Sequence, residues 1–181
     1  NLAANARGGR AHMGYGADTV FMTVAPCFHA SGLNATTTPA LVHAAQNHFL
    51  PEWDPETALR TMETREVTYT MLLPTMVIDL LEHGTEGYDL SAFESLNVGG
   101  SPMPRERIDA AEDALGCTLY EGYGMTETTL GAACNTPSQD TYTAGSIGPV
   151  AGEMAAGRVE DPDTGEAITV PGEKGELLWR G

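Results

Sequence analysis

Lysine is almost missing from this chain of 181 residues. Lys174 is the only one, and lysine and arginine together number 9 against 25 aspartates and glutamates, which leaves a net charge of −16. So acidic a chain is unsuited to nucleic acid and to anionic membrane surfaces, because both are bound through lysine and arginine. Two explanations of the acidity stay open: an ordinary acidic protein that its charge keeps in solution, and a halophilic protein. The shortage of lysine favours the halophilic interpretation.

Cysteine and long apolar runs are also scarce. The three cysteines, Cys27, Cys117 and Cys134, show no Cys-x-x-Cys spacing and are odd in number, so neither a zinc site nor a disulfide framework is indicated. We expect all three to be small buried apolar residues. No apolar run reaches the roughly 18 residues that a transmembrane helix needs, and no secretory signal pattern is present. These absences favour a cytoplasmic protein.

What the sequence does contain is an alternation of short apolar runs with amphipathic segments. Strands are predicted at residues 19–25, 46–50, 67–72, 95–98 and 117–120. Helices are predicted at residues 1–13, from Asp54-Pro55 onward, at 74–84 and from 102 or 104 to 115, with proline at helix starts and glycine at helix ends. This order is typical of α/β folds in which helices flank both faces of a mostly parallel sheet.

The character of the chain changes after residue 135. Turn residues at 145–149 and 161–165 separate short strands that are predicted at 153–160, 168–170 and 176–179. We therefore divide the chain into an α/β part at 1–135 and a β-rich continuation of the same domain at 136–181. The sequence begins without methionine and ends directly after a predicted strand, so we expect it to be a piece of a longer protein.

Three ends of predicted strands carry unusual residues. The first strand runs into Pro26-Cys27-Phe28-His29, and the fourth runs into Gly99-Gly100-Ser101-Pro102. The fifth runs into Tyr120-Glu121-Gly122-Tyr123-Gly124-Met125-Thr126-Glu127-Thr128. Since ligands of open α/β sheets bind beyond the carboxyl ends of the strands, we expect these three segments to form a single site.

The third of these segments is the most informative. Gly122 and Gly124 allow a sharp turn and the close approach of a ligand, and Tyr123 offers a flat ring for a base. Thr126 can donate to a phosphate oxygen, and Glu127 is a hard oxygen ligand suited to Mg²⁺. The segment therefore favours a site for a nucleotide and a metal. The competing interpretation is a tight strand-to-helix turn in which Thr126 caps the helix and Glu127 lies in its first turn.

The same segment resembles the Tyr-Gly-x-Thr-Glu signature of the adenylate-forming enzymes, which include acyl-CoA synthetases, luciferases and the adenylation domains of peptide synthetases. The resemblance implies that Tyr123 stacks on adenine, that Thr126 contacts the α-phosphate and that Glu127 binds Mg²⁺. The nucleotide-binding segment then comprises Gly122, Tyr123, Gly124, Met125 and Thr126.

Two further segments match this family in order. Pro26-Cys27-Phe28-His29 resembles the Pro-x-Phe-His segment of acyl-CoA synthetases, which implies that His29 lines the passage between acid pocket and nucleotide. Gly99-Gly100-Ser101-Pro102-Met103 resembles a Gly-Gly-Ala-Pro-Leu segment, which implies that the backbone of Gly99, Gly100 and Ser101 lies along adenine and the acyl group. Segments at 145–148 and 175–181 resemble later landmarks. The likeness covers nearly the whole chain and implies part of the N-terminal domain of an adenylate-forming enzyme.

The resemblance implies an acyl-CoA synthetase that uses ATP, Mg²⁺ and CoA, with a fatty acid as the leading substrate. A carboxylate would attack ATP to give acyl-AMP and pyrophosphate, and the CoA thiol would then displace AMP. Thr126, Glu127 and His29 would be the catalytic residues. Two alternatives stay open: an adenylation domain of the peptide-synthetase or aryl-acid type, and a non-catalytic nucleotide-binding module.

Some parts of the family pattern fall outside these residues. The phosphate loop would precede Asn1, whereas the ribose-binding aspartate, the hinge and the carboxy-terminal lysine would follow Gly181. We therefore expect this piece to be inactive by itself. The sequence does not indicate the oligomeric state, so a homo-oligomer stays open.

Overall fold

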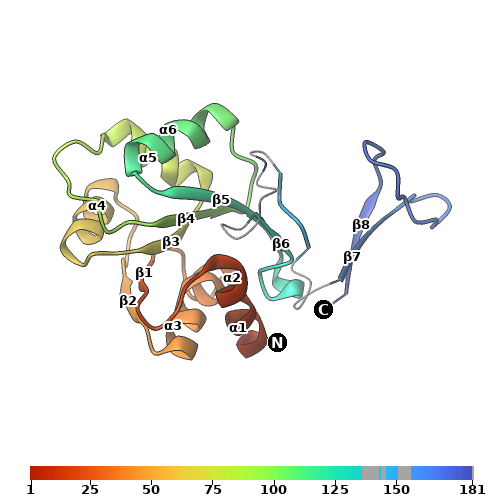
Figure 1. The fold of residues 1–181 in the computed structure, drawn as a ribbon, viewed down its shortest axis with the longest axis horizontal. Helices are drawn as coiled ribbons and strands as arrows, with labels where there is room; N and C mark the ends of the chain where they lie inside the picture. Colours follow the sequence, from red (N-terminus) through yellow and green to blue (C-terminus); the bar gives the residue numbers. More distant parts are fainter. Residues whose placement is uncertain (136–142, 144–145, 151–155, 181) are drawn as a thin grey trace.

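The computed structural model describes residues 1–135, 143, 146–150 and 156–180. Its main feature is a six-stranded sheet with the order β2-β1-β3-β4-β5-β6 (Figure 1). The strands are β1 (Val20–Thr23), β2 (Gln46–Phe49), β3 (Tyr69–Leu72), β4 (Ser95–Gly99), β5 (Thr118–Tyr123) and β6 (Ala133–Cys134). Strands β1 to β5 pair in parallel, whereas β6 pairs antiparallel with β5.

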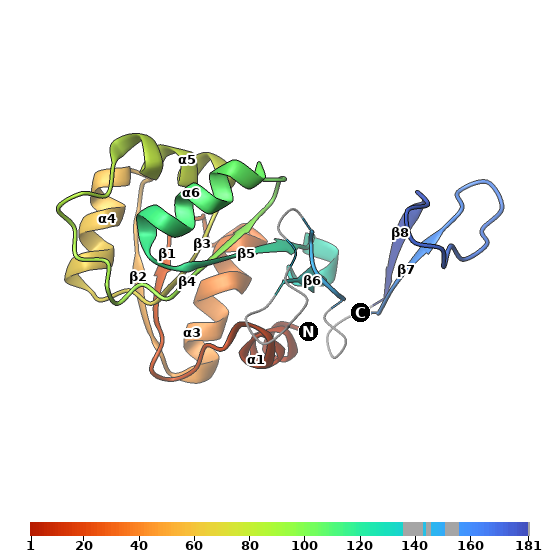
Figure 2. The same ribbon diagram turned by 45° about the horizontal axis from the view of Figure 1, so that its top comes forward.

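Helices cover both faces of this sheet, as Figures 1 and 2 show. One face carries α4 (Pro55–Thr64), α5 (Pro74–His83) and α6 (Arg105–Leu115). The other face carries α1 (Leu2–Met13) and a helical stretch made of α2 (Ala30–Gly32), the π-helix η1 (Leu33–Thr37) and α3 (Thr38–His43). This arrangement confirms the predicted fold class of a mostly parallel sheet flanked by helices.

Each face of the sheet has its own apolar core. The larger core lies under α4, α5 and α6, and its fully buried side chains include Leu59, Leu72, Leu80, Ile108 and Leu119. Full burial of one such side chain contributes about 1.5–3 kcal/mol, so this core joins the three helices firmly to the sheet. A smaller cluster on the opposite face contains Tyr15, Phe21, Ala40 and Tyr69.

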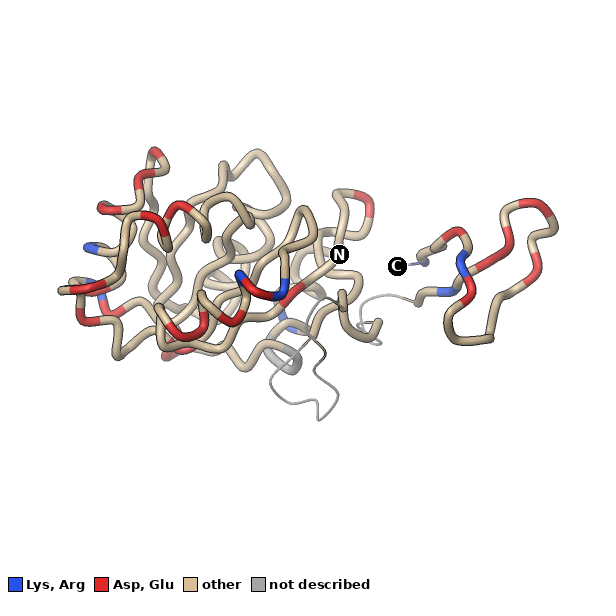
Figure 3. Tube along the Cα trace, turned by 90° about the horizontal axis from the view of Figure 1, so that it is seen from above, with Lys and Arg blue, Asp and Glu red and all other residues tan. Residues whose placement is uncertain are grey.

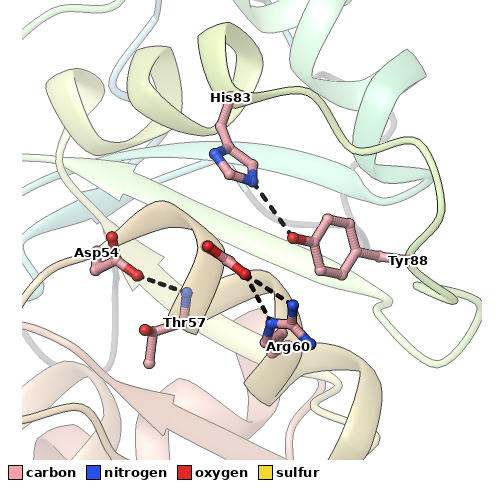
Figure 4. Close-up of polar contacts among 6 residues, drawn as sticks. Asp54, Thr57, Arg60, His83 and Tyr88 are labelled. Atoms are coloured by element: carbon pink, nitrogen blue, oxygen red, sulfur yellow. Dashed lines mark hydrogen bonds and ion pairs between the residues drawn. The ribbon is translucent and has the colours of Figure 1, made fainter.

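Local contacts confirm two predicted helix boundaries on the larger core, the start of α4 and the end of α6. The Oδ2 atom of Asp54 accepts a hydrogen bond from the backbone N–H of Thr57 at 2.8 Å and so caps α4, with a proline in the next position (Figure 4). One turn further along, the guanidinium of Arg60 donates to the Glu56 carboxylate at 2.8 and 3.0 Å. Helix α6 ends where Gly116 adopts a φ of 67°, a left-handed conformation that glycine adopts without strain.

The helical stretch over residues 30–43 is not predicted by the sequence. Its middle contains three consecutive threonines and a proline, which are poor helix formers. Tertiary contacts override this preference. The Thr36 hydroxyl lies 2.6 Å from that of Thr23 on β1, and a Cβ added to Gly32 would lie 2.2 Å from the Ala25 carbonyl oxygen. The stretch therefore packs directly against the end of β1, which a local pattern does not reveal.

The predicted β-rich continuation forms a two-stranded antiparallel sheet of β7 (Ala156–Glu160) and β8 (Glu176–Arg180). Figure 1 shows this hairpin extending away from the main sheet. Parts of the segments predicted at 145–149 and 153–160 lie outside the described residues. The division of the chain at residue 135 stays a prediction.

The hairpin loop agrees with the sequence in one part and differs in another. The turn at 161–165 is confirmed, because Oδ1 of Asp161 accepts from the N–H groups of Asp163 and Thr164 at 2.8 and 2.9 Å. The strand predicted at 168–170 is wrong. The pairing there is limited to an isolated bridge between Ala167 and Glu160, one residue before the predicted start.

Figure 3 shows many acidic residues and few basic ones, and every acidic residue except Asp18 lies at position 52 or later. Among the described residues two ion pairs form, Arg60–Glu56 and Arg158–Glu160. Most carboxylates therefore depend on water and dissolved ions for screening, and halophily stays a prediction. In the described part of the chain, no helix has both the length and the apolar character needed to cross a membrane.

Candidate functional site

A cavity of about 390 Å³ lies at the carboxyl ends of β3, β4 and β5. The structure brings most of the predicted site residues to its lining: His29, Gly99, Gly100, Gly122, Tyr123, Gly124, Met125, Thr126 and Glu127. Ser101 differs, since it is exposed and lies outside the lining. The three unusual strand ends therefore meet at one place, although they are far apart in the sequence.

The register of β4 and β5 explains how two of the glycine segments meet. Gly99 pairs with Gly122 across the parallel strands, and a Cβ on Gly99 would lie 3.1 Å from the Gly122 carbonyl oxygen. Gly100 then adopts a φ of 90°, which strains any other residue. These glycines keep side chains out of the cavity floor, so a flat ligand can approach the backbone there.

The turn after Tyr123, which we call the Thr-Glu turn (residues 124–130), holds Thr126 and Glu127 in a short 3₁₀ helix, η2 (Thr126–Thr128). Its N-cap is Met125, whose N–H donates to the Thr128 hydroxyl at 3.1 Å. The alternative of a tight strand-to-helix turn is therefore correct in placing Glu127 in the first turn of a helix and wrong only in naming Thr126 as its cap. Both Thr126 and Glu127 are exposed at the cavity, as a residue that contacts phosphate or metal has to be.

Two non-glycine residues in the left-handed region close the Thr-Glu turn. Thr129 has a φ of 61° and Leu130 a φ of 85°. Such backbone costs of the order of 1–3 kcal/mol per residue and persists only where surrounding contacts hold it. One contact is the side chain of buried Asn34, whose Nδ2 donates to the Thr129 carbonyl at 3.3 Å. Asn34 thus joins the helical stretch on one side of the cavity to the turn on the other.

His29 lies at the start of α2 and has a clear structural partner. Its Nδ1 accepts from the N–H of Ser31 at 3.2 Å and lies 2.7 Å from the Ser31 hydroxyl. The backbone donor fixes Nδ1 as an acceptor, so a neutral ring carries its proton on Nε2. The ring is exposed, and its Nε2–H remains suited to donate to an anionic ligand in the cavity.

The Tyr123 ring also contacts the hairpin formed by β7 and β8. Its ring stacks on that of Trp179 in β8 at a centroid distance of 5.9 Å and an interplanar angle of 22°. Trp179 does not line the cavity, whereas Tyr123 does. A stacked aromatic pair is worth about 0.5–1.5 kcal/mol beyond burial, so Trp179 helps fix the tyrosine plane.

Several lining residues escape the sequence analysis. They are Met13, Tyr15, Asn34, Tyr69, Met71, Asn97 and Cys134. A partial signal exists for the strand residues, because Tyr69 and Met71 alternate on a predicted strand and so share one face. Met13 ends a helix that the sequence predicts, but its place on the cavity lining, like those of Tyr15 and Asn34, follows from tertiary packing that the sequence does not show.

The cysteines agree only in part with the expectation of burial. Cys117 is buried, Cys134 is half-buried, and Cys27 is exposed, so the expectation is wrong for Cys27. Cys27 follows a proline in the turn before α2, where Phe28 is also 94% exposed. Burial raises the pKa of Cys134 to about 12, with the amide of Asn97 donating to its sulfur at 3.6 Å. This thiol therefore stays protonated at neutral pH.

The fit of Mg²⁺ rests on one carboxylate. Within the described residues, no group of three or more His, Cys, Asp or Glu side chains could hold a metal. Among the described residues on the lining, Glu127 is the acidic one. Magnesium is commonly held by one or two carboxylates together with phosphate oxygens and water. Glu127 therefore fits a Mg²⁺ ion that arrives with a nucleotide, and does not fit a dedicated metal cage.

The comparisons with known proteins agree with this geometry. The pattern of the family described as "AMP-binding enzyme" matches residues 1–181. The probable CoA ligase CCL5 of Humulus lupulus is 32% identical over 165 residues, which are 89% of this chain and 30% of that protein. The indoleacetate–CoA ligase of Aromatoleum aromaticum is 32% identical over 166 residues, 91% of this chain and 32% of that protein.

A solved structure is similar over nearly the whole chain. ATP-bound MatB from Rhodopseudomonas palustris matches with a TM-score of 0.85 at 26% identity, covering 99% of this chain and 35% of that chain. The chain spans about a third of the length of the curated relatives it matches. Sequence and fold thus agree on the resemblance that the strand-end segments indicate, and the chain belongs to the family of AMP-binding enzymes.

Proposed function

We propose that the protein containing this chain is an acid–CoA ligase that activates a carboxylic acid with ATP. The observation that carries the proposal is the meeting of His29, the Gly99–Gly100 backbone and the Thr-Glu turn around one cavity. Relatives named as CoA ligases support the same reaction class. ATP, acid and CoA would be its substrates, and a cytoplasmic location stays our prediction.

In the first step the acid carboxylate attacks the α-phosphorus of ATP and pyrophosphate leaves. The Gly99–Gly100 backbone and the Tyr123 ring would hold adenine between them, because all three residues line the cavity and the two glycines carry no side chain that obstructs it. Thr126 would donate to the α-phosphate. Holding the two reactants in line supplies much of the acceleration in such a reaction.

Negative charge increases on the phosphate oxygens as the carboxylate attacks. Glu127 would hold a Mg²⁺ ion, which offsets that charge when bound. The Nε2–H of His29 would donate to the acid carboxylate or to the phosphate and orient them. In the second step the CoA thiol attacks the acyl carbonyl and AMP leaves.

Three classes of acid are candidates for the substrate, and their support differs. A fatty acid stays the first prediction from the Pro-x-Phe-His segment. An aryl acid is the second candidate, and two observations favour it: Tyr15 and Tyr69 line the cavity, and one relative is named for indoleacetate. An amino acid has less support, because Glu127 is the acidic residue among the lining residues that the structure describes, and the reaction already employs it.

The test is acid-dependent ATP–pyrophosphate exchange by the full-length protein in high salt with Mg²⁺. The acids would run from acetate to palmitate, with benzoate, indoleacetate and amino acids. We expect Glu127→Gln to lower exchange by about 10²-fold or more, the usual effect of losing one electrostatic contact to the transition state. Glu106→Gln, on the exposed first turn of α6, is the matched control and should behave as wild type.

Two other results would change the conclusion. Exchange with amino acids alone would favour the peptide-synthetase type. Binding of ATP without exchange for any acid would favour the non-catalytic nucleotide-binding module and would overturn the ligase proposal.

A further inference from the structure

Two tyrosines separate the candidate site from a second cavity. The second cavity measures about 250 Å³ and lies at the amino ends of the strands, where its lining includes Thr68, Glu94 and Ser95. Tyr15 and Tyr69 line both cavities, with Met13 beside them. We call the Tyr15–Tyr69 pair the tyrosine wall.

The first cavity reaches this wall by running down the sheet face. Tyr69, Met71 and Leu73 all line it, and residues two apart on a strand point to the same face. Asn97 and Gly99 repeat this spacing on β4. The lining therefore descends from the carboxyl edge, where the nucleotide residues lie, to Tyr69 in the first position of β3. An acid bound beside the nucleotide has this path for its apolar body.

The wall is rigid because its rings support one another. Tyr15, Phe21 and Tyr69 form three edge-to-face pairs with centroid distances of 5.4 to 5.5 Å. Phe21 is fully buried, and Tyr15 and Tyr69 are 6% and 3% exposed. The Tyr15 hydroxyl also lies against Gly9 of α1, where a Cβ would overlap it. Met13 is the adaptable neighbour, since an unbranched thioether repacks easily.

We infer that the tyrosine wall sets the length limit of the acid, so that the site takes a compact carboxylic acid with a short chain or a single ring. This inference rests on the proposed function. The volume of the first cavity lies near the lower end of the range for small-molecule sites, about 300–1,000 Å³. The same cavity has to hold part of the nucleotide as well as the acid. A long-chain acid would reach the rings, and passing them would require three interlocked side chains to move.

The test compares exchange with straight-chain acids from acetate to dodecanoate in full-length variants. Tyr69→Val removes the ring and should join the two cavities, whereas Tyr69→Phe keeps the ring and the wall. Each methylene that a pocket rejects changes the rate by about 10-fold or more. We therefore expect the dodecanoate-to-butyrate ratio to rise at least about 10-fold in Tyr69→Val and to stay unchanged in Tyr69→Phe.

Tyr120 provides a control for the second cavity alone. It is buried and lines the second cavity but not the first, so Tyr120→Val should enlarge that cavity without opening the wall and leave the ratio unchanged. If Tyr69→Val does not fold, as melting temperature would reveal, Tyr69→Leu opens the wall with a smaller loss of volume.

The outcomes separate the two proposals. Suppose that the wild type shows exchange with short acids and that the dodecanoate-to-butyrate ratio is unchanged in folded Tyr69→Val or Tyr69→Leu. This result would overturn the inference about the tyrosine wall and leave the ligase proposal standing. A preference of the wild type for dodecanoate over butyrate would also overturn the inference about the tyrosine wall. Absence of exchange with every acid would instead overturn the proposed function.

Discussion

Replacing Gly124 by alanine tests whether the Thr-Glu turn must be as tight as the structure has it. A Cβ on Gly124 would lie 1.2 Å from the carbonyl oxygen of Leu130 and 2.3 Å from its carbonyl carbon. Carbon and oxygen atoms that are not bonded approach to about 3.3 Å, so the backbone has to separate by roughly 2 Å. Both obstructing atoms belong to the main chain, which cannot rotate away as a flexible side chain would.

The magnitude follows from what lies inside that turn. Thr126 and Glu127 sit between the two colliding residues, so any separation displaces them from the cavity. A misplacement of about 1 Å can lower a rate about 10²-fold, and overpacking of this kind costs about 1–3 kcal/mol of folding free energy. We expect Gly124→Ala to lose about 10²-fold or more in acid-dependent pyrophosphate exchange and to melt at a lower temperature.

Gly16 offers a matched control, because no atom lies within 4 Å of a Cβ added there and Gly16 is not on the cavity lining. Gly16→Ala should keep both the exchange rate and the melting temperature. The reasoning about the turn would be refuted if Gly124→Ala kept full exchange, or if both variants lost activity to the same extent.

Three further predictions concern other contacts. Trp179→Leu removes the ring that stacks on Tyr123, so the KM for ATP should rise about 2- to 10-fold, the equivalent of one aromatic pair, while the KM for the acid stays constant. Hydrogen bonds from Thr57 lower the pKa of Asp54 below its ordinary value of 3.8. Asp54→Ala should therefore melt earlier than wild type at pH 7, and the difference should vanish as the pH falls below 3.8 and through the lowered pKa. Iodoacetamide at pH 8 should alkylate exposed Cys27 first, as mass spectrometry would show, and buried Cys117, with its pKa raised to about 12, only after unfolding.

The parts of the fold that follow from sequence are those in which local and tertiary preferences agree. Helix α4 has a capping aspartate, a proline and an apolar face, and its predicted start is correct. The stretch over residues 30–43 has the opposite character, since threonine and proline disfavour the helix that packing against β1 imposes. Strand β6 has two residues and lies beside β5 because the Thr-Glu turn reverses the chain, which no periodicity could indicate.

The candidate site also has one part that follows from the sequence and one part that does not. Its strand ends can be predicted because glycine, tyrosine and acidic residues are unusual after buried strands, and parallel strands bring such ends to one edge. The conformation that displays Thr126 and Glu127 cannot be predicted, because Thr129 and Leu130 adopt positive φ values for which glycine or asparagine is the usual signal. Their backbone is held by Asn34, 95 residues away in the sequence. If that contact maintains the strained turn, Asn34→Ala should reduce exchange as Gly124→Ala does while leaving Tyr123 and its stacking partner in place.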